Sequence, residues 1–97
     1  MKITFHPEAS LELVEAAQFY DSRQEGLGNR FLDALDNALE AITEDPLLWR
    51  PDSCGRRQYL IWRFPYQLIY RIEKSQIIIL AVAHAGRKPG YWKHRDQ

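Results

Sequence analysis

Seven consecutive apolar residues, IIILAVA at positions 77–83, constrain the fold more than any other stretch of the sequence. A membrane-spanning helix needs roughly 20 apolar residues, so this run is too short to be one. Its β-branched residues favour a strand, and a strand that is apolar at every position buries both of its faces. We therefore predict a central strand at 76–84. Either the first strand and the loop at 46–56 cover its second face, or an apolar patch remains there for a partner.

The first half of the sequence has the periodicity of helices. A short strand is predicted at 2–6, and Pro7 suits the first turn of a helix. Gly26 and Gly28 separate two helical segments, and Pro46 ends the second. The apolar positions with helical spacing are Leu13, Ala16, Ala17 and Tyr20 in the first segment and Leu32, Leu35, Leu39 and Ile42 in the second. The acids of the first segment lie on another face of its helix, at Glu8, Glu12 and Glu15.

After the loop that follows Pro46, the apolar period changes from helical to two. Strands are predicted at 57–64, 66–72 and 76–84, with a bend at Pro65 and a turn at 73–75. The 97 residues are enough for a single domain with one core. We predict an α+β fold in which a helical hairpin packs on one face of a small antiparallel sheet, in the order β-α-α-β-β-β.

Charge is divided unevenly along the sequence. Residues 1–48 contain ten acids and three bases, a net charge of −7, whereas residues 49–97 contain ten bases and three acids, a net charge of +7. Either the basic half binds an anionic or acidic partner, or the two halves attract one another within the fold. The single cysteine, Cys54, cannot form an internal disulfide, and the first residues, MKITFHPEA, lack the apolar core of a secretion signal. We therefore expect a cytoplasmic protein without a membrane segment.

The residues that could perform chemistry follow the central strand. His84 stands at the end of that strand and could transfer a proton near neutral pH, and Arg87 could hold a phosphate. Tyr91 could stack on a base or donate a proton. Together they resemble the parts of a metal-free ribonuclease. The alternative is structural, with Tyr91 and Trp92 folding back to cover the core. No CxxC, HExxH or glycine-rich phosphate loop is present, so we expect no metal and no cofactor.

Three segments of the sequence resemble the RelE/ParE superfamily of toxins from type II toxin–antitoxin systems, which includes plasmid stabilisation proteins. They are PEASLELVEAAQFYDSRQEGLGNRFLDAL (7–35), RRQYLIWRFPYQLIYRI (56–72) and IIILAVAHAGRKPGYWKHR (77–95). The most specific parts are FPYQLIYRI and HAGRKPGYW. The resemblance implies a cognate antitoxin protein and a toxin–antitoxin hetero-oligomer. It also implies one of two targets, because RelE-like members cut messenger RNA on the ribosome and ParE-like members bind DNA gyrase.

The residues that match the superfamily favour the ParE-like branch. RelE-type nucleases place lysines roughly where Leu60 and Trp62 stand, and an arginine where Gln67 stands. Loss of such charges should cost a nuclease a factor of about a hundred or more for each one. We therefore expect a non-enzymatic gyrase inhibitor. The alternatives are a metal-independent endoribonuclease, with the catalytic residues His84, Arg87, Tyr91 and Arg63, and a non-toxic protein that acts in antitoxin complex formation and operon control.

Two binding surfaces are predicted from these considerations. The target-binding residues are expected to be Arg57, Arg63, Arg87, Lys88, Tyr91, Trp92, Lys93 and Arg95, a basic and aromatic set of the kind found at binding hot spots. An acidic and apolar segment of the antitoxin is expected on a face of the sheet and on its basic strand edge, at Tyr59, Ile61, Ile69, Arg71 and Ile79.

Overall fold

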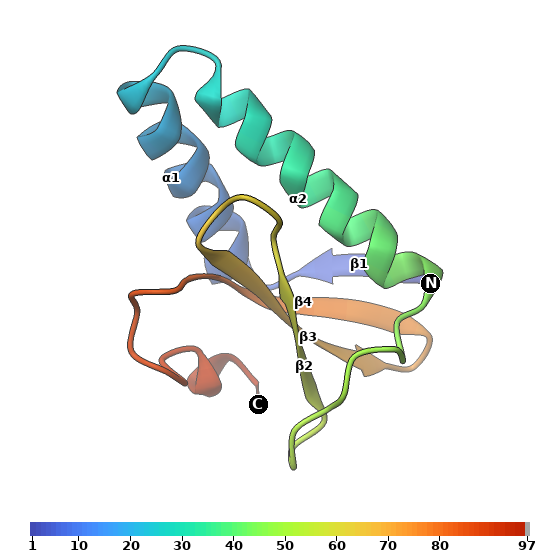
Figure 1. Ribbon diagram of the computed structural model, residues 1–97. Helices are drawn as coiled ribbons and strands as arrows, with labels where there is room; N and C mark the ends of the chain where they lie inside the picture. Colours follow the sequence, from blue (N-terminus) through green and yellow to red (C-terminus); the bar gives the residue numbers. More distant parts are fainter. Residues whose placement is uncertain (97) are drawn as a thin grey trace.

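The computed structural model describes residues 1–96 and contains a four-stranded sheet with a helical hairpin on one face (Figure 1). Its elements are β1 (Lys2–Phe5), α1 (Pro7–Arg23), α2 (Leu27–Glu44), β2 (Arg56–Leu60), β3 (Tyr66–Glu73), β4 (Gln76–His84) and the 3-10 turn η1 (Lys93–Arg95). This order confirms the predicted α+β class and the order β-α-α-β-β-β. None of the helices formed by residues 1–96 combines the length and the apolar character needed to cross a membrane.

The sheet is mixed rather than purely antiparallel. Its strand order is β1-β4-β3-β2, with β1 parallel to β4 and the other neighbours antiparallel. The three C-terminal strands are joined by short turns, which requires antiparallel pairing, whereas the chain leaves β1 through both helices before it returns to the sheet. The first strand is therefore free to join the edge of β4 in parallel.

Local sequence explains where the helices begin and how closely they pack. The ring Nδ1 of His6 accepts a hydrogen bond from the Glu8 backbone N–H, which caps the start of α1. The Oδ1 atom of Asp21 accepts from the N–H groups of Gly26 and Gly28 at the start of α2. A Cβ at Gly28 would stand 2.6 Å from the carbonyl oxygen of Ala17, so only glycine allows the two helices to approach this closely.

The main core lies between the helical hairpin and the sheet. A β-bulge between Ile69 and Tyr70 places Leu80 as an extra residue in β4 and changes which side chains face the helices. Ile79 and Val82 both face the helices as a result, and Leu80 and Ala81 both face away. The buried residues of the main core are Ala9, Ala16, Phe31, Leu35, Ala38, Ile42, Ile61, Leu68, Tyr70, Ile77, Ile79 and Val82.

The second face of the sheet is covered by the C-terminal segment. Trp92 is only 6% exposed and packs against Ile69, Leu80, Ala81 and Ala83. The alternative in which Tyr91 and Trp92 fold back onto the core is therefore confirmed. Both alternatives left open for this face, cover by β1 and the 46–56 loop or an apolar patch left for a partner, are therefore wrong, because the C-terminal aromatic residues fill that position.

The β2–β3 hairpin turns earlier than predicted. β2 ends at Leu60, and the backbone N–H of Ile61 donates to the carbonyl oxygen of Tyr66 to close the turn. Arg63 lies within the turn with a φ of 74°, a left-handed conformation that is uncommon for residues other than glycine. The strand predicted at 57–64 is therefore too long, because residues 61–64 lie outside β2.

Candidate functional site

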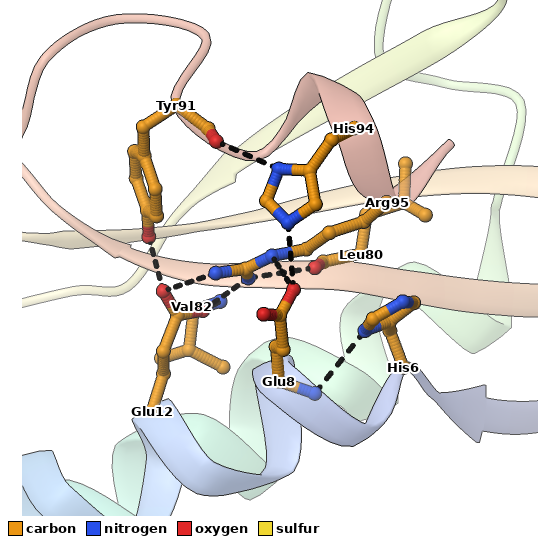
Figure 2. Close-up of polar contacts among 8 residues, drawn as sticks. All are labelled: His6, Glu8, Glu12, Leu80, Val82, Tyr91, His94 and Arg95. Atoms are coloured by element: carbon orange, nitrogen blue, oxygen red, sulfur yellow. Dashed lines mark hydrogen bonds and ion pairs between the residues drawn. The ribbon is translucent and has the colours of Figure 1, made fainter. Parts of the chain in front are cut away.

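Residues 86–96, called the strap below, cross the second face of the sheet and are attached at both ends of their path. At the end near the helices, the strap contacts Glu8 and Glu12 of α1 (Figure 2). At the other end, Asp96 pairs with Arg71 of β3 at 2.9 Å and with Arg56 of β2 at 3.7 Å. The strap is thus part of the folded domain and not a free tail.

Glu12 is the centre of the first attachment. One carboxylate oxygen accepts from the Val82 backbone N–H at 3.0 Å and from Arg95 at 2.8 Å, and the other accepts from the Tyr91 hydroxyl and from Arg95 at 3.1 Å (Figure 2). The side chain of Arg95 is 6% exposed, and that of Glu12 is 13% exposed. A carboxylate shielded in this way, with charge-assisted bonds to both of its oxygens, binds its partners strongly.

The same residues complete the edge of β4 where β1 ends. The pairing of β1 with β4 stops at Ile79, which leaves the polar backbone groups beyond it to find other partners. The Val82 N–H donates to Glu12, and the Leu80 carbonyl accepts from Arg95 at 3.1 Å. Side chains from α1 and the strap therefore take the place of a neighbouring strand at this edge.

These contacts shift the pKa values of three side chains. Burial raises the pKa of the Tyr91 phenol above its ordinary value, and the hydrogen bond to Glu12 raises that pKa further. Burial alone would lower the pKa of Arg95, but the contacts with Glu12 outweigh it and raise that pKa. Glu8 is more exposed, and its hydrogen bond with His94 lowers its pKa. Arg95 therefore stays charged opposite Glu12, and Tyr91 stays protonated beside them.

Three of the four candidate nuclease residues line one groove beside the strap, the strap groove. Its volume is about 290 Å³, and it is lined by Glu12, Glu15, Ala16, Phe19, Tyr66, Val82, His84, Arg87 and Tyr91. The guanidinium of Arg87 lies over the Tyr91 ring, 3.9 Å from its centroid. The Nδ1 atom of His84 accepts from the Gly86 backbone N–H at 2.8 Å. The groove thus combines the predicted residues with two carboxylates that the prediction did not include.

Arg63 lines a different groove, the hairpin groove, which lies between α2 and the β2–β3 turn. This groove has a volume of about 590 Å³ and is lined by Tyr20, Leu27, Arg30, Asp33, Ala34, Asn37, Trp62, Arg63, Phe64 and Pro65. It shares no residue with the strap groove. Arg63 therefore does not join His84, Arg87 and Tyr91 in one site.

The predicted target-binding residues divide into an exposed and an enclosed group. Arg63, Arg87, Lys88 and Lys93 are exposed. Arg57 is half-buried and donates to the carbonyl oxygens of Leu47 and Trp49, Tyr91 is half-buried against Glu12, and Trp92 and Arg95 are enclosed. The expected exposure of Trp92 and Arg95 is wrong, because one packs on the sheet and the other is paired with α1.

The predicted antitoxin surface is also largely inaccessible. Ile61 and Ile79 are buried beneath the helices, and Ile69 is buried beneath the strap. Only Tyr59 and Arg71 retain partial exposure, and Arg71 is already paired with Glu73 and Asp96. Since both faces of the sheet are covered, the prediction that the antitoxin lies on a sheet face does not fit this structure.

Sequence reasoning missed Glu8 and Glu12, which it placed on a face away from the core. Glu12 stands three residues after Ala9 and four before Ala16, both of which are buried, so helical spacing did place it beside the packed face. Part of the opposite charge of the two halves is satisfied internally through these acids. Within residues 1–96, no three His, Cys, Asp or Glu side chains are grouped in a way that could hold a metal ion.

Comparisons with known proteins agree with this fold. Residues 3–89 match the family described as the ParE toxin of the type II toxin–antitoxin system, parDE. The structure is similar to one titled as a chromosomal ParDE TA system from P. aeruginosa, with 19% identity, a TM-score of 0.65 and coverage of 87% of this chain and 95% of that one. It is also similar to a YoeB/ParE toxin from Agrobacterium tumefaciens, with 13% identity, a TM-score of 0.58 and coverage of 87% and 98%. No curated protein matches the sequence significantly.

Proposed function

This chain belongs to the ParE toxin family of type II toxin–antitoxin systems, and from that premise we propose that it blocks growth by binding DNA gyrase rather than by cutting RNA. Membership in the family makes it the toxin component, with an antitoxin protein as its partner. The target of the toxin is inferred from the residues that line the strap groove and from the side chains at the hairpin tip.

The observation that carries the proposal is the shortage of cations in the lining of the strap groove. Glu12 and Glu15 line it together with His84, Arg87 and Tyr91, and Glu12 is already paired with Arg95. A phosphodiester in this groove would meet the single guanidinium of Arg87 beside the carboxylate of Glu15, where a nuclease needs several cations that stabilise the developing charge. In addition, the Tyr91 hydroxyl already donates to Glu12 and its pKa is raised, so it is poorly placed to exchange protons.

The hairpin tip argues against RNA cleavage in a second way. Leu60 and Trp62 stand roughly where RNA-cutting relatives carry lysines, and here they are among the most exposed apolar side chains of the domain. Apolar side chains do not neutralise phosphate, but they do bind other proteins. At these positions the chain therefore presents a protein-binding surface where a nuclease would present charge.

We assign the contact with gyrase to the exposed cations of the strap. Arg87, Lys88 and Lys93 are all exposed, and the ring of Tyr91 supports the Arg87 guanidinium from below. Because gyrase acts while bound to DNA, a rigid cationic surface suits a protein–DNA complex of net negative charge.

A supercoiling assay tests this proposal. Purified toxin added to gyrase, plasmid and ATP should increase gyrase-linked cleaved DNA. Arg87→Ala should weaken that effect by about fivefold or more, since arginine is enriched among residues that carry binding energy. Arg50→Ala is the matched control, because Arg50 is also exposed but lies in the loop after α2. Unchanged gyrase activity at saturating toxin would contradict the proposal.

The ribosome-dependent endoribonuclease remains the second candidate, because His84, Arg87 and Tyr91 do share one groove. In that case, expression of the toxin should produce cuts within the codons of translated messages, mapped by primer extension, and Arg87→Ala should abolish them. Intact messages during growth arrest would eliminate this candidate. Normal growth with folded toxin and no antitoxin would instead support the non-toxic alternative.

A further inference from the structure

We propose that the hairpin groove, with Trp62 in its lining, is the docking surface for the antitoxin, and that it receives a short segment whose bulky apolar side chains are flanked by carboxylates. The inference rests on the proposed function only in taking the antitoxin as the partner. It replaces the expected site on the face of the sheet, which the helices and the strap already cover.

The groove has the size and the walls of a binding site. One wall is the N-terminal half of α2, and the other is the turn at 62–65, which rises beside the helices in Figure 1. Tyr20 of α1 and Phe64 of the turn contribute aromatic surface, and their rings contact each other at 4.9 Å between centroids. A volume of about 590 Å³ can accommodate a few large side chains, since ligand sites typically span roughly 300–1,000 Å³.

The lining of the groove includes apolar surface that is exposed to solvent in the free toxin. Trp62 is 79% exposed, the highest value among the large apolar side chains of residues 1–96. The turn that displays Trp62 includes Arg63 in its left-handed conformation, which costs free energy. A strained turn that holds a tryptophan in water next to an apolar groove is expected where a partner later covers that surface.

Charge identifies the chemistry of the segment. Arg30 on α2 and Arg63 on the turn face the groove from opposite walls, and neither takes part in an ion pair among residues 1–96. Asp33 is the single acid of the lining. Carboxylates on both sides of the apolar anchors would therefore find a cation at each wall.

The rest of α2 limits where the segment can lie. Beyond Asn37, the last lining residue of α2, the helix exposes the acids Glu40 and Glu44, which would repel an acidic segment. The segment is thus confined to the part of α2 before Glu40. A second copy of the toxin fits less well, because a two-fold contact at this patch would bring the arginines of both copies together.

A single substitution tests the groove with a matched control. Trp62→Ser removes the exposed ring from the lining of the groove. Leu48→Ser removes a side chain that is also exposed, 65%, and that does not line the groove. Affinity for the antitoxin encoded beside the toxin is measured by isothermal titration calorimetry, and circular dichroism verifies the fold of each variant. We expect the dissociation constant to rise by about 30-fold or more for the groove variant and by less than about threefold for the control.

The charges are tested separately with Arg30→Glu, which should also weaken binding and should reduce its dependence on salt. Equal affinity of wild type and groove variant would overturn the inference. So would a groove variant that binds the antitoxin normally but no longer acts on gyrase, or a wild-type dimer in sedimentation that the substitution dissociates. If wild type leaves gyrase unaffected while the groove variant still loses antitoxin affinity, the gyrase proposal fails and the docking inference stands.

Discussion

Two tryptophans in this toxin, Trp92 on the strap and Trp62 on the hairpin, differ in how far they are buried. Trp92 is 6% exposed and lies on the sheet, whereas Trp62 is 79% exposed and lies in water. The difference follows from their neighbours. Trp92 is flanked by Tyr91, Arg95 and Asp96, each of which has a partner elsewhere in the domain. The contacts made by nearby polar residues thus hold Trp92 against the sheet.

The largest effect that separates the two regions is expected from truncating each tryptophan. Trp92→Ala should lower the free energy of unfolding by about 3–5 kcal/mol, because it removes the cover of the second sheet face. Trp62→Ala should change it by less than about 0.5 kcal/mol, since the side chain is already in water. Urea denaturation measures both. Equal losses would show that the hairpin is packed in solution or that the strap is not.

A smaller but still substantial loss is expected when the strap loses its central partner. Glu12→Gln leaves the enclosed Arg95 guanidinium without its buried counter-charge, which should cost about 2–3 kcal/mol. Glu15→Gln is the control, because Glu15 lies on the same helix and is exposed. The two variants are compared by thermal and urea unfolding, and similar stabilities would contradict the role given to Glu12.

Tyr91→Phe should cost about 1–2 kcal/mol, the contribution of a hydrogen bond to a charged group. It should also change the alkaline limb of stability. The pKa of Tyr91 is raised above its ordinary value of 10.0, so the contribution of the protonated phenol is complete below pH 10 and declines as pH rises above it. Unfolding followed from pH 8 to pH 11 should show this decline in wild type and a flatter curve in the variant.

The smallest effect is expected at the exposed contact between Glu8 and His94. The pKa of Glu8 is lowered from 4.5, so this contact stabilises the fold above pH 4.5 and loses its effect as the carboxylate is protonated at lower pH. Glu8→Gln should therefore differ from wild type near neutral pH and low salt, and the difference should shrink in acid or in high salt. A difference that persists at pH 3 would assign the effect to something other than this charge.

The parts of the fold that depend on local pattern could be predicted from the sequence. The strand predicted at 76–84 is β4, which occupies Gln76–His84. A short run of β-branched residues that is apolar on both faces identifies a buried strand clearly. The helical hairpin was also predictable from its spacing and its glycines. The end of β2 was not, because the left-handed backbone of Arg63 is unfavourable for that residue type and leaves no mark in the sequence.

The candidate site was harder to predict than the fold. His84, Arg87 and Tyr91 were identified by residue type and do line one groove. Glu12 was missed because its partners, Val82, Tyr91 and Arg95, are far away in the sequence. The expectation of an exposed basic tail was wrong for the same reason, since the acids that hold the strap belong to the first helix.

The attachment of the strap to α1 joins the two extremes of the chain. The Glu12 contacts with Val82, Tyr91 and Arg95 span 70, 79 and 83 positions, and the contact of Glu8 with His94 spans 86. A nascent chain therefore exposes the second face of its sheet until residues 91–95 have left the ribosome. The acids of α1 are made early and remain without these partners through most of synthesis.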